Sequence, residues 1–303
     1  MTTAVRDVEL ALAVGAELGE GPVWDERAAE LYFVDILGRS VHAYRPADGA
    51  HRRFAVDRFV GAVALREDGG LVLAAHDVFL TADRDGGRIQ RLGHFAVDGT
   101  VVRFNDGKVD PHGRFVAGTM HFGQSDEAGA LYALDGDARV RTLLEGVTVS
   151  NGLAWSADGS LLYYIDSPTK TIDAFDVHPE TGALANRRAV ARIENGSPDG
   201  MAIDDEGLLW VAVFEGARVE RIDPARGTCA AVVRLPTPQA TSVAFAGPAL
   251  DQLYVTTARE GFSAKRRRGD PHAGDLFVVS PGVSGPPARR FALAPGHVAS
   301  SAL

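Results

Sequence analysis

Short apolar runs separated by tight turns recur along the whole chain, and few windows place apolar residues at the three- and four-residue spacing of a helix. Glycine occurs 34 times and interrupts almost every segment. The pattern therefore predicts short β-strands joined by turns such as Asp158-Gly159 and Asp68-Gly69. Six of the apolar runs align with one another. They lie at residues 30–36, 70–75, 114–119, 161–166, 208–213 and 252–257.

The aligned runs repeat every 40 to 47 residues. An apolar strand and a turn precede each run, and most runs are followed by a third strand. A period in this range with about four strands per unit is typical of a β-propeller, in which sheets packed radially bury both their faces. We predict an all-β fold, a six-bladed β-propeller with four-stranded antiparallel blades, with residues 1–303 as a single domain. A β-sandwich or a set of separate domains is the alternative, and it does not explain so regular a period.

Composition excludes several classes of protein. Hydrophobic residues make up 46% of the chain and charged residues 23%, as in an ordinary globular protein. The net charge of −9 disfavours nucleic acid as a partner. Cys229 is the only cysteine, so no intramolecular disulfide can form.

The first 21 residues lack the basic start and apolar run of a signal peptide. No apolar stretch approaches the ~20 residues of a membrane span. We therefore expect a cytoplasmic protein with no membrane partner; the sequence does not indicate its oligomeric state.

Four segments place a carboxylate or carboxamide beside glycine just before an apolar strand, at the same phase of their repeats. The innermost strand of each propeller blade lines the channel, so side chains at the start of these strands converge on one axis. Glycine beside them allows close approach of the backbone. The segments are 18–25, 103–120, 150–159 and 197–207, and their polar residues are Glu20, Asn105, Asp106, Asn151 and Asp199.

Carboxylate and amide oxygens are hard ligands that suit Ca²⁺, Mg²⁺ or Mn²⁺. Any one of these segments alone is explained by the turn-forming tendency of Asn-Gly and Asp-Gly. Four such segments in phase favour a metal site at the channel mouth.

An ordered set of motifs also makes the chain resemble a known family. The motifs are LGEGP at 18–22, YFVD at 32–35, RFNDG at 103–107, DP at 110–111, GTM at 118–120, SNG at 150–152, PDG at 198–200, TSVAF at 241–245, LYVTTAR at 253–259 and AGDLF at 273–277. In this order and spacing, over nearly the whole chain, they resemble the SMP-30/gluconolactonase/regucalcin family of six-bladed propellers. The sequence GTMH at 118–121 looks like that of bacterial sugar lactonases of the family.

The resemblance implies that Glu20, Asn151 and Asp199 bind one divalent metal. Ca²⁺ is the favoured ion, and Zn²⁺, Mn²⁺, Mg²⁺ and Fe²⁺ are alternatives. It also implies that Arg103 and Asn105 contact oxygens of the substrate.

His121 follows the channel-side turn, and we expect it to contact substrate as well. Regucalcin-type members have a glutamate that helps to hold substrate where this chain has Phe122. The identity of the sugar is therefore not predicted.

The function predicted on this basis is metal-dependent hydrolysis of an aldonolactone, a carboxylic ester, to the sugar acid in carbohydrate oxidation. The metal would polarise the lactone carbonyl. Asp199 is the predicted general base, with another group as the alternative. The competing functions are a calcium-binding protein of the regucalcin type, a phosphotriester hydrolase on the same propeller, and a peptide-binding scaffold.

Other motifs carry less weight. Ser167 and Lys170 match the S-x-x-K pattern of some hydrolases, but that motif requires a helix and we treat the match as chance. The basic run at 265–268 predicts a solvated loop. Trp24, Trp155 and Trp210 lie in or after apolar strands and predict core positions.

Overall fold

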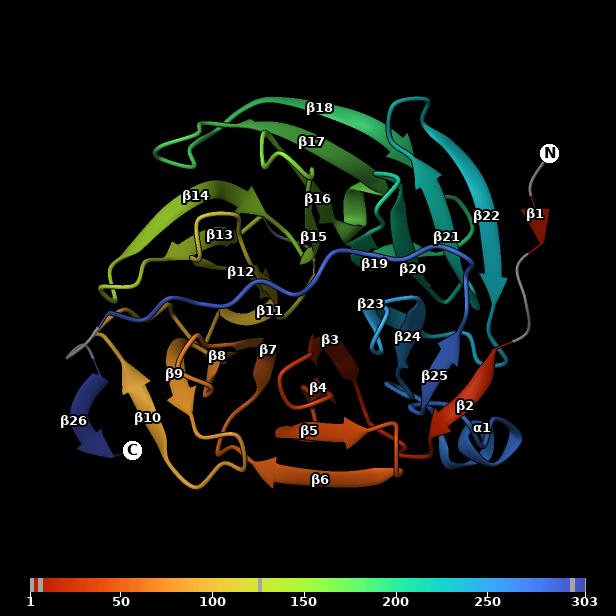
Figure 1. Cartoon of the computed structure of the whole chain (residues 1–303), viewed down its shortest axis with the longest axis horizontal. Helices are drawn as coiled ribbons and strands as arrows, with labels where there is room; N and C mark the ends of the chain where they lie inside the picture. Colours follow the sequence, from red (N-terminus) through yellow and green to blue (C-terminus); the bar gives the residue numbers. More distant parts are fainter. Residues whose placement is uncertain (1–2, 5–7, 125–126, 295–297, 303) are drawn as a thin grey trace.

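The computed structural model describes residues 3–4, 8–124, 127–294 and 298–302. Its strands form six sheets arranged around a central channel, so the predicted six-bladed β-propeller is confirmed (Figure 1). Each sheet contains a set of four antiparallel strands, also as predicted.

One strand from each sheet lines the channel. Each of these inner strands contacts the inner strand of the next sheet, and β23 contacts β3, so the ring is closed. The inner strands are β3 (Gly19–Asp25), β7 (Val60–Leu65), β11 (Val102–Val109), β15 (Ser150–Trp155), β19 (Ser197–Ile203) and β23 (Ala240–Ala246).

The second strand of each blade coincides with one of the six aligned apolar runs. Almost every residue in these strands is buried, because neighbouring blades cover both faces of each sheet. They are β4 (Glu30–Asp35), β8 (Leu71–Ala75), β12 (Phe115–His121), β16 (Leu161–Asp166), β20 (Leu209–Phe214) and β24 (Gln252–Thr257).

The third strands follow in the same order. They are β5 (Ser40–Arg45), β9 (Val78–Ala82), β13 (Gly129–Leu134), β17 (Thr171–Val177), β21 (Arg218–Asp223) and β25 (Leu276–Val279).

The outermost strands face solvent and are the most polar. Five follow directly in the chain, but the outer strand beside β25 comes from the N-terminal region, which closes the ring by pairing antiparallel with it. Two blades also carry a fifth edge strand, β1 (Thr3–Ala4) beside β22 and β26 (Val298–Ala302) beside β10. The outer strands are β6 (Ala50–Ala55), β10 (Ile89–Leu92), β14 (Val140–Val147), β18 (Leu184–Arg192), β22 (Thr228–Arg234) and β2 (Glu9–Leu12).

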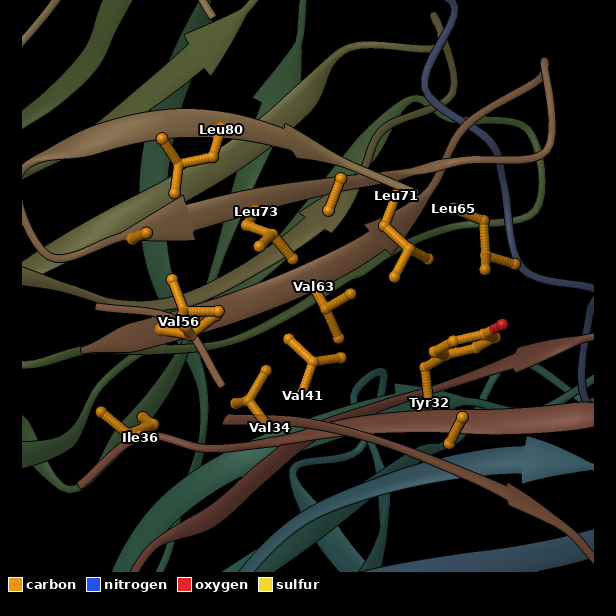
Figure 2. Packing of buried hydrophobic residues seen from close by; sticks show 14 of the residues in the cluster. Tyr32, Val34, Ile36, Val41, Val56, Val63, Leu65, Leu71, Leu73 and Leu80 are labelled. Atoms are coloured by element: carbon orange, nitrogen blue, oxygen red, sulfur yellow. The ribbon is translucent and has the colours of Figure 1, made fainter. Parts of the chain in front are cut away.

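The core consists of apolar layers between adjacent blades. Figure 2 shows the layer between the first two blades, where Val34 and Val41 from one sheet face Val63, Leu73 and Leu80 from the next. Val34, Leu73 and Leu80 have no exposed surface. At about 1.5–3 kcal/mol per buried aliphatic side chain, these layers supply the main force that holds the blades together.

Helix is scarce in the described part of the chain, as the sequence predicts. A 3₁₀ turn, Ser167–Thr169, joins β16 to β17. The prediction of a loop at 265–268 is wrong, because this run lies in the short helix α1 (Ala264–Gly269). Ser263 caps the helix, and Arg267 forms an ion pair with Glu17, which neutralises part of the basic run. No helix among the described residues is long and apolar enough to cross a membrane.

Candidate metal and substrate site

All six inner strands carry a β-bulge near their first residues. The extra residue in a bulge interrupts the alternation of the strand and re-aims a side chain. The predicted metal and substrate residues of the inner strands lie at or beside these bulges. The interruptions lie between Glu20 and Val23, Val60 and Ala62, Phe104 and Asp106, Asn151 and Leu153, Pro198 and Met201, and Ala240 and Ser242.

Glycine beside these side chains allows the inner strands to pack closely. A Cβ atom on Gly152 would lie 2.6 Å from the backbone oxygen of Asp199 on the next strand, and one on Gly200 would overlap the hydroxyl of Ser242. Any larger residue would push neighbouring blades apart at the level where the polar side chains meet.

Two aspartates at the ends of second strands hold the loops that lead into inner strands. Asp35 accepts hydrogen bonds from the backbone N–H groups of Glu17 and Leu18, both at 3.0 Å. Asp166 does the same for Thr148 and Val149, at 3.0 and 2.8 Å. The strands that carry Glu20 and Asn151 therefore begin from fixed points.

The first halves of four inner strands, β3, β11, β15 and β19, line a cavity of about 150 Å³ at one end of the channel. Five of the predicted site residues line it together, although they come from four blades. His121 is different: it is half-buried at the end of β12, and Met120 rather than His121 lines the cavity. The five predicted residues in the wall are Glu20, Arg103, Asn105, Asn151 and Asp199.

A chain of hydrogen bonds fixes the orientation of both carboxamides. Ser167 donates its proton to the backbone oxygen of Pro198 at 2.6 Å, so its hydroxyl oxygen accepts from Nδ2 of Asn151 at 2.8 Å. Oδ1 of Asn151 consequently faces away from Ser167, where Nδ2 of Asn105 donates to it at 3.1 Å. Oδ1 of Asn105 in turn accepts from Arg103 at 2.7 Å.

The site buries more negative charge than its own residues neutralise. Burial raises the pKa of Asp199 well above its usual range, and the charges of Glu20, Asp106 and Glu260 raise it further. Burial, followed by the charge of Asp106, also raises the pKa of Glu20. Within the described residues, Oδ1 of Asp199 is buried and has no hydrogen-bond partner.

Arg103 is the cation of the site. It is 5% exposed, and burial lowers its pKa to about 10, while the charges of Glu260, Glu20 and Asp199 oppose that shift. Arg103 therefore remains charged at neutral pH.

A divalent cation fits this arrangement of oxygens. It would neutralise Glu20 and Asp199 and give the unpartnered Oδ1 of Asp199 a partner, with Oδ1 of Asn151 as a third ligand. No group of three or more His, Cys, Asp or Glu side chains suited to a metal occurs in the described part of the chain. A cation held here would thus depend on the carboxamide.

Comparison with known proteins identifies the family. The model of the family described as SMP-30/Gluconolactonase/LRE-like region matches residues 18–259. The chain belongs to this family.

The relatives of this family member cover almost all of it. Regucalcin from Oryctolagus cuniculus is 39% identical over 293 residues, which are 94% of this chain and 98% of the relative. The solved structure of a luciferin-regenerating enzyme is 32% identical, with a TM-score of 0.86, and covers 94% of this chain and 100% of that one. Regucalcin from Agrobacterium tumefaciens, a calcium-binding protein, has a TM-score of 0.89 at 25% identity, covering 96% and 99%.

Four polar residues of the cavity wall were not predicted from the sequence of this family member: Gln124, Ser167, Ser197 and Glu260. Ser167 follows β16 and Glu260 lies in the loop after β24, so both come just after second strands. The ends of second strands lie at the same end of the channel as the starts of inner strands, because the two strands pair antiparallel. A search for polar residues just after each aligned apolar run would therefore have identified Ser167 and Glu260 from the sequence.

Proposed function

We propose that this chain hydrolyses a small sugar lactone in the cavity at the start of the inner strands, with a divalent cation held by Glu20, Asn151 and Asp199. The observation that carries the proposal is the excess of buried carboxylates beside a buried arginine in an accessible cavity. Membership of a family whose description includes gluconolactonase supports it. Aldonolactones carry the carbonyl and hydroxyl oxygens that such a site would bind.

The cation would polarise the lactone carbonyl and stabilise the negative charge that develops on its oxygen. Oxygen donors favour Ca²⁺, with Zn²⁺, Mn²⁺, Mg²⁺ and Fe²⁺ as alternatives. The hydrogen bond from Asn151 to Ser167 would keep its amide oxygen turned towards the ion.

Asp199 would act as the general base. Its carboxylate has two oxygens, so one can bind the cation while the other accepts a proton from an attacking water. Neutralisation of the site by the cation would keep this carboxylate ionised, against the burial and neighbouring charges that raise its pKa.

Arg103 and Glu260 would hold the substrate. The hydrogen bonds that Arg103 donates to Phe104 and Asn105 both leave from Nη1, so Nη2 and Nε can donate to lactone oxygens. The Glu260 carboxylate lines the same wall and can accept from sugar hydroxyls.

The test is acid release from glucono-, xylono- and arabinonolactone by protein stripped of metal and then reloaded with each of the five cations. We expect turnover to disappear on stripping and to return with at least one ion. Asp199→Asn should lower kcat by about 100-fold or more. Asp158→Asn, the same change in an exposed turn, should leave kcat unchanged. Absence of turnover on every lactone with every ion would exclude the proposal.

A calcium-binding role is the second candidate, because the similar structure from Agrobacterium tumefaciens is described as a calcium-binding protein. The same preparations discriminate between the two. Calcium binding with no turnover on any lactone or phosphotriester would favour this role, and binding that Asp199→Asn weakens would place the ion at the proposed residues.

A further inference from the structure

A second cavity, of about 290 Å³, occupies the other end of the channel. Its walls come from the later halves of the inner strands, and it shares no lining residue with the first cavity. Residues 286–289 form one side of it. They belong to the segment that follows β25, which crosses the face of the ring towards β26 (Figure 1).

This crossing segment is fixed on both sides of the cavity. On one side, Ser284 Oγ donates to the carboxylate of Asp205 at 2.6 Å. On the other, the buried Arg290 forms an ion pair with the buried Asp25 at 2.6 Å, and Phe291 is fully buried. The cavity is therefore a built chamber rather than a gap under a loose chain.

The walls of the chamber are largely apolar and include three aromatic side chains. Trp24, Trp155 and Phe245 line it. Each is buried, as the sequence predicts for the two tryptophans. Such walls bind a flat apolar group.

Two cations in the chamber wall lack a carboxylate partner among the described residues. Lys108 donates only to the backbone oxygen of Met201, at 2.7 Å, which leaves two of its three protons unused. The side chain of Arg289, at the exposed rim, forms no hydrogen bond or ion pair with the described residues.

The acidic residues of the wall are already engaged. Asp204 binds Trp210 and Arg221, and Asp205 binds Ser284. Asp106 accepts from the Gly107 N–H and is the one carboxylate whose charge acts on Lys108. Its charge also acts on Glu20 and Asp199, so it does not neutralise Lys108 alone.

We propose that this chamber is a second ligand site, which binds a small aromatic carboxylate. Lys108 and Arg289 bind the carboxylate group, and Trp24, Trp155 and Phe245 pack against the ring. The argument does not depend on lactone hydrolysis, because no residue of the first cavity takes part.

Calorimetric titration of the full chain with 1-naphthoate tests the proposal, with the uncharged 1-naphthamide as the matched probe. We expect one naphthoate per chain and binding of the amide at least about tenfold weaker. Lys108→Met should weaken naphthoate binding by about tenfold or more, and Arg289→Gln should weaken it as well. Lys265→Met, the same change at an exposed lysine, should leave the affinity unchanged.

Arg103→Gln shows which cavity is occupied, since Arg103 is the cation of the first cavity, and this variant should bind naphthoate as the wild type does. Circular dichroism confirms that each variant is folded. If Lys108→Met does not fold, Arg289→Gln still tests the proposal, because Arg289 lies on the surface. Three results would overturn the proposal. The first is that the wild type does not bind naphthoate at about 1 mM. The second is that Arg289→Gln and folded Lys108→Met both bind naphthoate with the affinity of the wild type. The third is that Arg103→Gln is the one variant that loses binding.

Discussion

Ser167 shows how one buried hydroxyl can determine what a neighbouring side chain offers to the cavity. Because it donates to Pro198, it can only accept from Asn151, and the amide oxygen of Asn151 is turned away from it. Ser167→Ala removes this constraint. We expect calcium affinity to fall by about tenfold or more in calorimetric titration, as for other groups that orient a metal ligand. Ser160→Ala, in an exposed turn, is the control, and equal affinity in the two variants would contradict the proposed role.

The proposed role of Glu260 in holding substrate depends on the negative charge of its carboxylate. Its carboxylate lines the first cavity, where it faces the buried Arg103 and the carboxylates of Glu20 and Asp199. We expect Glu260→Gln to raise KM for the lactone by about tenfold and to change kcat much less, because an amide accepts hydrogen bonds from sugar hydroxyls more weakly. Steady-state kinetics measures both. Glu194→Gln, at an exposed position, should change neither, and an unchanged KM in Glu260→Gln would contradict the assignment.

At the scale of the element, the third strand of the first blade contains a histidine that folding holds uncharged. His42 on β5 is 3% exposed and lies 3.0 Å from both Ser40 and His51. Burial, and then the charge of His51, lowers the pKa of His42 to about 4 from its ordinary value of 6.5. The folded protein therefore binds this proton less readily than the unfolded chain.

The contribution of His42 to the free energy of unfolding should accordingly be fully present above pH 6.5. It should be lost as the pH falls towards 4. The difference in pKa corresponds to about 3 kcal/mol of unfolding free energy. Urea unfolding at a series of pH values measures it. His42→Gln should flatten this part of the profile, whereas His94→Gln, in a loop, should not. If the unfolding free energy of His42→Gln falls with pH as steeply as that of the wild type, other groups are responsible for the pH dependence.

The whole molecule is a ring whose two chain ends are tied to distant blades. The N-terminal strand β2 pairs with β25, and the segment after β25 crosses to the blades on the other side (Figure 1). Phe291 in that segment is fully buried among residues of the second and third blades, and its backbone bonds with Leu65 and Glu67. A single segment thus joins the last blade to the interface between two earlier ones.

Phe291→Ala should lower the free energy of unfolding by about 3–5 kcal/mol, because it removes a large side chain from a closed core. Chemical denaturation measures the change. Phe122→Ala is the matched control, since Phe122 is 42% exposed, and it should cost less than about 1.5 kcal/mol. A small effect at Phe291 would mean that the crossing segment does not contribute to the closure of the ring.

The sequence alone was sufficient for the repeat, the six aligned strands and the convergence of Glu20, Asn105, Asn151 and Asp199. These features follow from local spacing: turns and apolar alternation define each strand, and a constant period places equivalent residues at equivalent positions of a ring. The roles of these residues in binding metal and substrate stay predictions.

Only the tertiary structure decided which other residues reach the same cavity. Glu260 lies 240 residues from Glu20 in the chain, and closure of the ring brings the two together. The same closure produced the chamber around Lys108 and the segment that covers it. Contacts of this kind depend on how six sheets pack around one axis and on where the bulges shift their register, and no local pattern of residues contains that information.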